Sequence, residues 1–153
     1  MSQNYPRVEI NKLDLLLPEE LYEILKVREE VFHMEQHITE PDLDGVDRNA
    51  YLVMLLTKRD TINGCCRLFP DSEKHSRWMI GRLAVRKEYR GHGYGRQLMM
   101  YAIKEASVRG AKEVAVHAQV QVLKFYEMLG FQTEGEMFME AGIQHVPMVY
   151  KIT

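Results

Sequence analysis

RGHGYGRQLM, residues 90–99, places Gly91, Gly93 and Gly95 at alternate positions directly before a segment that we predict to be a helix over 94–109. Glycine in the first turn of a helix costs about 1 kcal/mol relative to alanine, because it has more backbone entropy to lose. Three glycines therefore indicate positions that need a positive φ angle or an amide group with no side chain beside it. The fold and the function that the sequence predicts both depend on this turn.

Two well-known glycine motifs do not fit the stretch. A P-loop requires Lys followed by Ser or Thr, and the dinucleotide fingerprint requires a third glycine three positions after the second, whereas the spacing here is G-x-G-x-G. A helix N-terminus still offers unpaired N–H groups and about half a positive charge, so the turn predicts a phosphate site, with Arg90 and Arg96 as flanking partners. The alternative is a tight strand-to-helix turn whose glycines serve geometry alone.

Length and composition predict one soluble domain spanning 1–153, with 46% hydrophobic and 27% charged residues. The net charge of −2 predicts neither nucleic acid nor an anionic membrane as a partner. No apolar run approaches the roughly 20 residues of a membrane span, and no signal-peptide core is visible near residue 1. The adjacent Cys65 and Cys66 point to opposite faces of a strand, and we interpret them as reduced thiols in a cytoplasmic protein. No His/Cys cluster predicts a metal.

Short apolar runs and helical patterns alternate along the chain. We expect loops or turns over 39–49 and 57–64, strands over 7–10, 50–56, 65–69, 77–85, 113–119, 131–138 and 145–152, and helices over 18–35, 94–109 and 122–129. Gly110 and Gly130 are natural C-terminal caps for the second and third helices. The order predicts an α/β fold, with a mixed central β-sheet of about six to seven strands flanked by helices on both faces.

Longer motifs carry a family resemblance. RLAVRKEYRGHGYGRQLM (82–99) resembles the acetyl-CoA segment of the GCN5-related N-acetyltransferases (GNAT), whose Arg/Gln-x-x-Gly-x-Gly/Ala signature is here Arg90, Gly93 and Gly95. HAQVQVLKFYEMLGF (117–131) resembles the family's strand–helix–strand unit. VREEVFHMEQ, DLDGVD and FMEAGIQHVPM resemble the ElaA-like subgroup, except that Gln144 stands where its last motif usually has proline. The resemblance runs from about residue 20 to the C-terminus and implies a single-domain GNAT fold.

The same resemblance implies acetyl-CoA as the cosubstrate. The 90–95 turn would hold the pyrophosphate, 83–85 would offer backbone groups to the pantetheine arm, and Gln119 stands where the family often has an asparagine that binds it. The implied acetyl-CoA-binding residues are Leu83, Ala84, Val85, Arg90, Gly91, His92, Gly93, Tyr94, Gly95, Arg96 and Gln119. We expect Gly93→Val to weaken acetyl-CoA binding strongly and to leave the fold intact.

Acetyl transfer to an amine needs a proton for the departing thiolate, whose pKa resembles the 8.5 or so of Cys, and tyrosine stays protonated at neutral pH. Tyr126 occupies the family position for this general acid, and its other interpretation is an aromatic residue packed on Phe125 and Phe131. If it is the acid, Tyr126→Phe should remove a basic limb from the pH–rate profile.

The general base that takes a proton from the amine has three candidates. We rank His145 first, because histidine titrates near pH 6.5 and its tail motif matches the subgroup. Glu35 comes second and His117 third. Each also has a purely structural interpretation: Glu35 as a solvent-exposed carboxylate, and His117 as a buried histidine whose hydrogen bonds are made within the core.

The acceptor pocket should lie between the first helix, the loop after it and the C-terminal strands. An acidic stretch there (Glu35, Glu40, Asp42, Asp44 and Asp47) favours a cationic amine, or is only a solvated loop. Arg28, Arg67 and Arg82 favour instead a carboxylate or phosphate on the acceptor. The two signals point in opposite directions.

The function that this sequence predicts is direct transfer of an acetyl group from acetyl-CoA to a primary amine of a small molecule. A non-catalytic acyl-CoA-binding sensor and a protein or peptide N-acetyltransferase are the alternatives. The expected partner is the small-molecule amine, and a homodimer is allowed; nucleic acid, membrane and metal are not expected.

Overall fold

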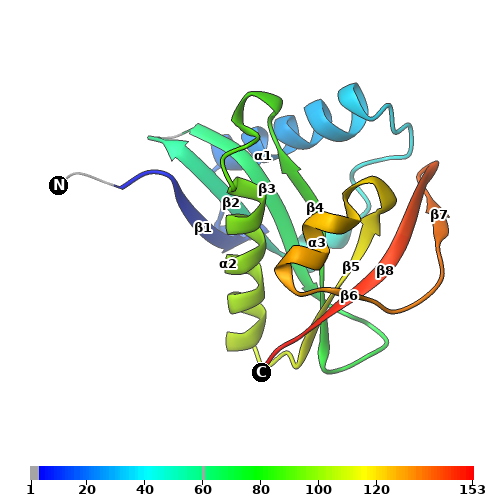
Figure 1. Ribbon diagram of the computed structural model, residues 1–153. Coiled ribbons are helices and arrows are strands. Elements are labelled where there is room, and N and C mark those ends of the chain that lie inside the picture. Colours follow the sequence, from blue (N-terminus) through cyan, green and yellow to red (C-terminus); the bar gives the residue numbers. More distant parts are fainter. Residues whose placement is uncertain (1–3, 60) are drawn as a thin grey trace.

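The computed structural model of the chain describes residues 4–59 and 61–153 (Figure 1). Its strands are β1 (Arg7–Lys12), β2 (Tyr51–Lys58), β3 (Thr61–Pro70), β4 (Arg77–Val85), β5 (Glu113–Gln119), β6 (Gln132–Thr133), β7 (Phe138–Glu140) and β8 (Ile143–Lys151). Its α-helices are α1 (Pro18–Arg28), α2 (Tyr94–Val108) and α3 (Leu123–Leu129). A π-helical segment, η2 (Glu29–Glu35), continues α1, and 3-10 turns lie at Leu13–Leu15, Val46–Asn49 (η3), Lys87–Tyr89 and Val120–Val122.

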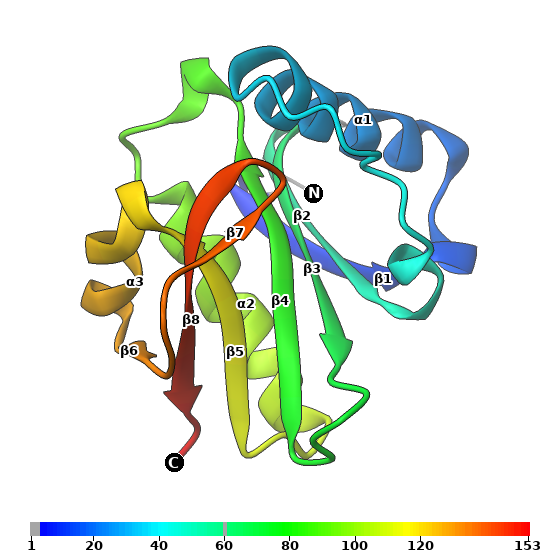
Figure 2. The same cartoon turned by 90° about the vertical axis from the view of Figure 1, so that its right-hand side faces the viewer.

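The strands form one mixed sheet in the order β1-β2-β3-β4-β5-β8-β6, and β7 pairs with β8. Among the strand pairs of the described residues, only β4 and β5 run parallel. Helix α1 covers one face, and α2 and α3 cover the other (Figures 1 and 2). Cys65 is buried in the layer under α1 and Cys66 in the layer under α2, and both thiols are free. The predicted α/β class, mixed sheet and two helical layers are confirmed.

The sheet has eight strands, because the strand expected over 131–138 is divided into β6 and β7. The division lies opposite Pro147 of β8, whose carbonyl accepts from Glu134 N–H at 2.8 Å. Proline has no N–H to return, so the ladder with β8 ends there.

The predicted hairpin of the strands on either side of 57–64 is confirmed, but the bounds of its turn were too wide. β2 continues to Lys58, β3 begins at Thr61, and the two strands pair antiparallel. Asn63 looked like a turn residue, but it is 2% exposed within β3 and satisfies its amide by donating to Thr57 Oγ1 at 2.7 Å and accepting from Arg86 Nη1 at 2.9 Å. A buried polar side chain with partners is compatible with a strand interior.

The helix expected over 18–35 is α-helical only through Arg28. In η2 the turns widen, and Gln36 N–H donates to Val31 O five residues earlier. Side chains of this segment make long-range contacts at both ends: Glu30 accepts from Arg86 at 2.7 Å, and Glu35 contacts Arg90. These tertiary contacts favour a geometry that the local periodicity does not predict.

Strands β4 and β5 diverge, and this opening positions the site. They pair only where Arg77–Met79 face Glu113–Ala115, and beyond those residues the two strands separate (Figure 2). The paired end is fixed by Glu113, which is buried yet holds its charge: hydrogen bonds from Lys74, Arg77 and Lys151 outweigh desolvation and lower its pKa to about 2. On the diverging part of β4, Arg82 has a φ of 53°, and the register with β3 shifts across Cys65 and Arg67.

The β7–β8 hairpin turns through Ala141 and Gly142, with φ angles of 52° and 75° between paired Glu140 and Ile143. Positive φ at both positions is the geometry for which Asn-Gly is preferred, and alanine there costs about 1–2 kcal/mol. We expect Ala141→Asn to raise the free energy of unfolding by about 1 kcal/mol, measured by urea titration. Gly142→Ala is the matched control and should lower it; an unfolding midpoint for Ala141→Asn at or below the native one would contradict this turn geometry.

Candidate functional site

The glycine turn before α2 has a distinct role for each glycine. Gly91 and Gly93 have φ angles of 84° and 77°, and a Cβ atom at either would meet nothing within 4 Å. Gly95 is helical, and a Cβ there would lie 3.4 Å from the Phe125 ring, so its small size serves packing. Backbone geometry alone therefore justifies the first two glycines, but the open space beside them also leaves room for a ligand.

Free donors face that space. The first hydrogen bond of α2 runs from Gln97 N–H to Gly93 O at 3.0 Å, so the N–H groups of Tyr94, Gly95 and Arg96 have no partner within the helix. Together with the helix dipole they form a site for an anion such as phosphate. These residues fit the pyrophosphate of an acyl-CoA, which would be held by backbone amides at this turn.

A cleft of about 1450 Å³ runs from this turn along the opening between β4 and β5. It brings together all the predicted site residues except His92, whose ring packs beside Tyr94 with centroids 5.6 Å apart. The predicted residues that line it are Glu35, Leu83, Ala84, Val85, Arg90, Gly91, Gly93, Tyr94, Gly95, Arg96, Gln119, Tyr126 and His145, with Arg28, Arg67 and Arg82. The third base candidate, His117, lines it as well.

Two residues at the end of η2 bridge the walls of the cleft. Glu35 accepts from both terminal nitrogens of Arg90 at 2.8 Å, while Arg90 Nε donates to Val85 O at 2.9 Å. On the other wall Gln36 Oε1 accepts from Gln119 Nε2 at 2.9 Å. Both carboxylate oxygens of Glu35 thus accept hydrogen bonds from one guanidinium, so in this structure Glu35 is a partner of Arg90. The amide of Gln119 is likewise held by a neighbour.

Tyr126 lies in the cleft wall on α3. Its ring packs edge-on against Phe125 and Phe131, with centroids 5.0 and 5.7 Å away, and its side chain is buried. Burial raises the pKa of its hydroxyl well above 10. The packing interpretation is therefore confirmed for the ring. Because the pKa of the hydroxyl is raised, we expect it to stay protonated in the usual range of assay pH and to contribute no basic limb there.

Two histidines share one carboxylate at the rim of the cleft. Glu140 Oε1 lies 3.0 Å from His117 Nδ1, and Glu140 Oε2 lies 3.9 Å from His145 Nε2. His145 is buried, and its Nδ1 lies 2.7 Å from Ile143 O. The hydrogen bond with Glu140 raises the pKa of His117. Glu140 was not among the residues singled out from the sequence.

The opposing charges in the acceptor region pair with one another. Arg28, 2% exposed, donates to both carboxylate oxygens of Asp47 at 2.9 and 3.2 Å, and its Nε lies 2.8 Å from Asp42 Oδ2. Arg67 donates to both oxygens of Asp44 at 2.9 and 2.7 Å. These hydrogen bonds lower the pKa of Asp44 to about 2, against the opposing effect of burial.

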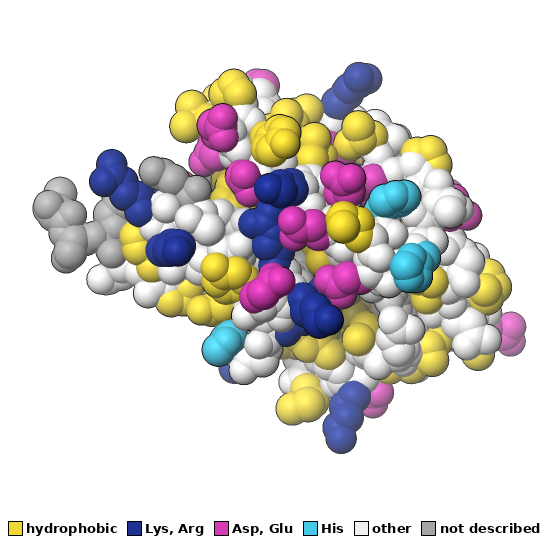
Figure 3. Space-filling view, turned by 90° about the horizontal axis from the view of Figure 1, so that it is seen from above, with side chains coloured by type: hydrophobic (Ala, Val, Ile, Leu, Met, Phe, Trp, Pro, Cys, Tyr) yellow, Lys and Arg dark blue, Asp and Glu magenta, His cyan; other side chains and the backbone are white. Residues whose placement is uncertain are grey.

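The third arginine closes the cluster, with Arg82 Nε donating to Asp42 Oδ1 at 2.9 Å. Seen from above, side chains of both signs mingle over the middle of the surface (Figure 3). Of the charges that the acidic and basic predictions name, Glu40 alone has no ion pair within the described residues; it is exposed and lines the cleft, and the others are paired. The loop over 39–49 is instead pinned to β3, β4 and the end of α1 by ion pairs.

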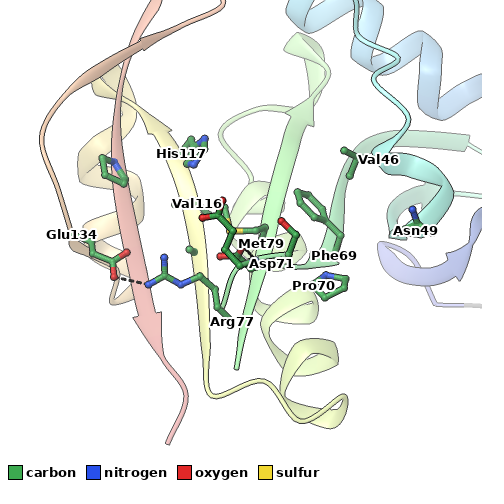
Figure 4. A pocket seen from close by; sticks show the side chains of 14 residues that line it. Val46, Asn49, Phe69, Pro70, Asp71, Arg77, Met79, Val116, His117 and Glu134 are labelled. Carbon is green, nitrogen blue, oxygen red and sulfur yellow. Dashed lines mark hydrogen bonds and ion pairs between the residues drawn. The ribbon is translucent and has the colours of Figure 1, made fainter. Parts of the chain in front are cut away.

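A second cavity of about 530 Å³ adjoins the cleft on the same side of the sheet as α1, over β3, β4 and β5 (Figure 4). Val46, Phe69, Met79 and His117 line both spaces. Its floor is largely apolar, and one end is closed by the ion pair of Arg77 and Glu134 (Figure 4). An acceptor bound in the cleft can extend into this space.

The glycine turn calls for a cleaner variant than Gly93→Val. At a φ of 77°, a branched side chain at position 93 strains the backbone by about 1–2 kcal/mol, so Gly93→Val would change the stability of the protein as well as the ligand space. Gly93→Asn tolerates this conformation and places a side chain in the ligand space. We expect it to abolish most of the rise in melting temperature that millimolar CoA produces.

Gly110 supplies the matched control, because it has a φ of 93° and open space at the opposite end of α2. Gly110→Asn should keep the full CoA-dependent rise. An undiminished rise in Gly93→Asn would show that the glycines serve the turn alone.

Comparison with known proteins agrees with this geometry. The family model described as "Acetyltransferase (GNAT) domain" matches residues 18–152. A UPF0039 protein of Schizosaccharomyces pombe is 31% identical over 140 residues, 90% of each chain. The crystal structure of Escherichia coli ElaA has a TM-score of 0.86 at 26% identity and covers 95% of this chain and 99% of its own. An acyl-CoA N-acyltransferase from Pseudomonas aeruginosa has a TM-score of 0.86 at 27% identity, with the same coverage.

Among the described residues, no helix is long and apolar enough to cross a membrane. Within the same part of the chain, no group of three or more His, Cys, Asp or Glu side chains is arranged to hold a metal ion.

Proposed function

The chain belongs to the GNAT acetyltransferase family, whose fold is that of acyl-CoA-dependent acyltransferases, and from that premise we propose that it transfers an acetyl group from acetyl-CoA directly to a primary amine of a small molecule. One observation supports the proposal: the residues of the α2 turn, Tyr126 and His145 all line one cleft. An anion site, a proton donor and a proton acceptor in one space are what the reaction requires.

Each step has a residue suited to it. His145 takes a proton from the ammonium form of the acceptor at Nε2, since Nδ1 faces the Ile143 carbonyl. The freed amine attacks the thioester carbon, the carbon–sulfur bond breaks, Tyr126 protonates the departing thiolate, and the nitrogen loses its second proton to solvent as the amide forms. Burial raises the pKa of Tyr126, so the hydroxyl keeps its proton until the thiolate leaves. The same raised pKa makes proton transfer to the thiolate energetically uphill. Solvent then reprotonates the Tyr126 phenolate.

The acceptor region favours a small molecule without strong charge selection. Because Arg28, Arg67 and Arg82 are paired with aspartates, an anionic acceptor would have to displace a carboxylate of the protein. The apolar floor of the second cavity, with Phe69 and Met79, suits the aliphatic or aromatic remainder of an amine.

A panel of amines tests the proposal, with release of the CoA thiol as the readout. Acetylation of free amines supports it. CoA-dependent stabilisation without turnover on any amine supports a sensor, and acetylation of peptides alone supports a peptide N-acetyltransferase. Absence of any CoA-dependent stabilisation at millimolar ligand contradicts all three.

A further inference from the structure

We propose that Glu140 is a positioning residue for acetyl transfer: its single carboxylate is shared between His117 and His145, so that the charge on His117 controls how readily His145 accepts a proton. The inference rests on the proposed function for the role of His145 as the base. It adds a role for Glu140, and a coupling between the protonation of His117 and that of His145, which acetyl transfer itself does not require.

The β7–β8 hairpin places the three groups together. Phe138 pairs with His145 across the hairpin, and Glu140 pairs with Ile143 at its tip (Figure 2). His117 reaches the cluster from β5, where it lies opposite Pro147 of β8. The Phe138 ring fixes both imidazoles, edge-on to His117 at 5.1 Å and stacked on His145 at 5.8 Å. Neither histidine depends on Glu140 alone for its place.

The tautomer of His145 follows from its contact with the backbone. A carbonyl only accepts, so Nδ1, 2.7 Å from Ile143 O, carries the hydrogen of the neutral ring. Nε2 then holds the lone pair, on the side of Glu140 and the cleft. When Nε2 takes a proton, a buried imidazolium forms, and a buried charge needs a counter-charge. Glu140 supplies it from 3.9 Å.

The same carboxylate already has a nearer partner. His117 lies 3.0 Å away, and their hydrogen bond raises the pKa of His117 and lowers that of Glu140. Asp71, after β3, also raises the pKa of His117, and Arg82 on β4 helps to lower that of Glu140. One negative charge cannot fully compensate two imidazolium rings, so protonation of either histidine should disfavour protonation of the other.

This arrangement predicts opposite effects for two conservative variants. Glu140→Gln removes the counter-charge and keeps the shape, so His145 becomes a weaker base and the acidic limb of the kcat/KM profile moves to lower pH by about one unit. His117→Asn removes the competing cation, so that Glu140 stabilises only the imidazolium of His145. His145 then becomes a stronger base, and the acidic limb moves to higher pH. Glu136→Gln is the control: it removes a carboxylate from the exposed segment before β7, which does not line the cleft, and should leave the profile in place.

Imidazole resonances followed by NMR titration give a readout that does not need turnover. The pKa of His145 should fall in Glu140→Gln and rise in His117→Asn, whether or not a suitable amine has been found. Shifts of both variants in the same direction, or no shift, would overturn the coupling. NMR shifts as expected, with an unmoved pH–rate profile, would overturn the positioning role and remove His145 as the base. Failure of every amine as a substrate would instead refute the proposed function.

Discussion

Tyr126→Phe is expected to lower the turnover number by about 10²- to 10⁴-fold, the usual contribution of one general acid. The change removes a hydroxyl and keeps the ring that packs against Phe125 and Phe131, so folding and CoA-dependent stabilisation should be preserved. Single-turnover acetylation measures the loss where chemistry limits the rate. Because burial holds the Tyr126 pKa well above 10, the variant and the native protein should show the same profile at high pH.

Tyr150→Phe serves as the control for this substitution. Tyr150 also packs on Phe131, at 5.5 Å between centroids, and does not line the cleft. Its loss of a hydroxyl should leave turnover unchanged. Native turnover in Tyr126→Phe would exclude the acid role and leave Tyr126 as a packing residue, with the thiolate protonated by solvent.

Arg28→Met is expected to destabilise the protein by about 3–5 kcal/mol, a large part of the stability of an ordinary domain. The reason is the carboxylate left behind: Asp47 is 9% exposed, would lose both hydrogen bonds from Arg28, and would keep only the longer ion pair with Arg67 Nη1 at 3.4 Å. Urea unfolding measures the effect. The double variant Arg28→Met with Asp47→Asn removes the stranded charge as well and should regain part of the loss.

The decisive comparison for Arg28 and Asp47 is whether the changes in free energy of unfolding of the two single variants add up to that of the double variant; we expect that they do not. A double variant as unstable as the sum of the two single variants would show that Arg28 and Asp47 act independently. A single variant Arg28→Met with native stability would show that water solvates Asp47 and that the loop over 39–49 is not held by its ion pairs.

What the sequence could predict here is what depends on neighbours along the chain. The positive φ angles of Gly93 and Gly130, the alternation at Cys65 and Cys66, and the start of α2 each follow from a few adjacent residues. The family motifs extend this local reasoning to the cleft. The strand boundaries that were predicted wrongly lie near Asn63 and opposite Pro147. At both places, contacts with a neighbouring strand determine where the strand begins or ends.

The charge pairs could not be predicted because their partners lie far apart in the chain. Arg90 meets Glu35 across 55 positions, and His117 meets Glu140 across 23. The sequence around Glu35 is compatible with a general base, because nothing in it shows that both carboxylate oxygens accept hydrogen bonds from a distant guanidinium. Glu140 gave one weak signal, its place beside the Ala141-Gly142 turn in the motif that ends at His145.

The position of the two thiols has a practical consequence for the kinetics of chemical labelling. Burial raises the pKa of Cys65 to about 12 and that of Cys66 well above 9, so neither thiolate is populated in the folded protein at neutral pH. A disulfide reagent that reports the CoA thiol therefore meets almost no background from the native enzyme. Once turnover stops, the rate at which the same reagent slowly labels the protein's cysteines measures the rate of unfolding. Because Cys65 lies under α1 and Cys66 under α2, unequal labelling of these neighbours would reveal which layer of the molecule opens first.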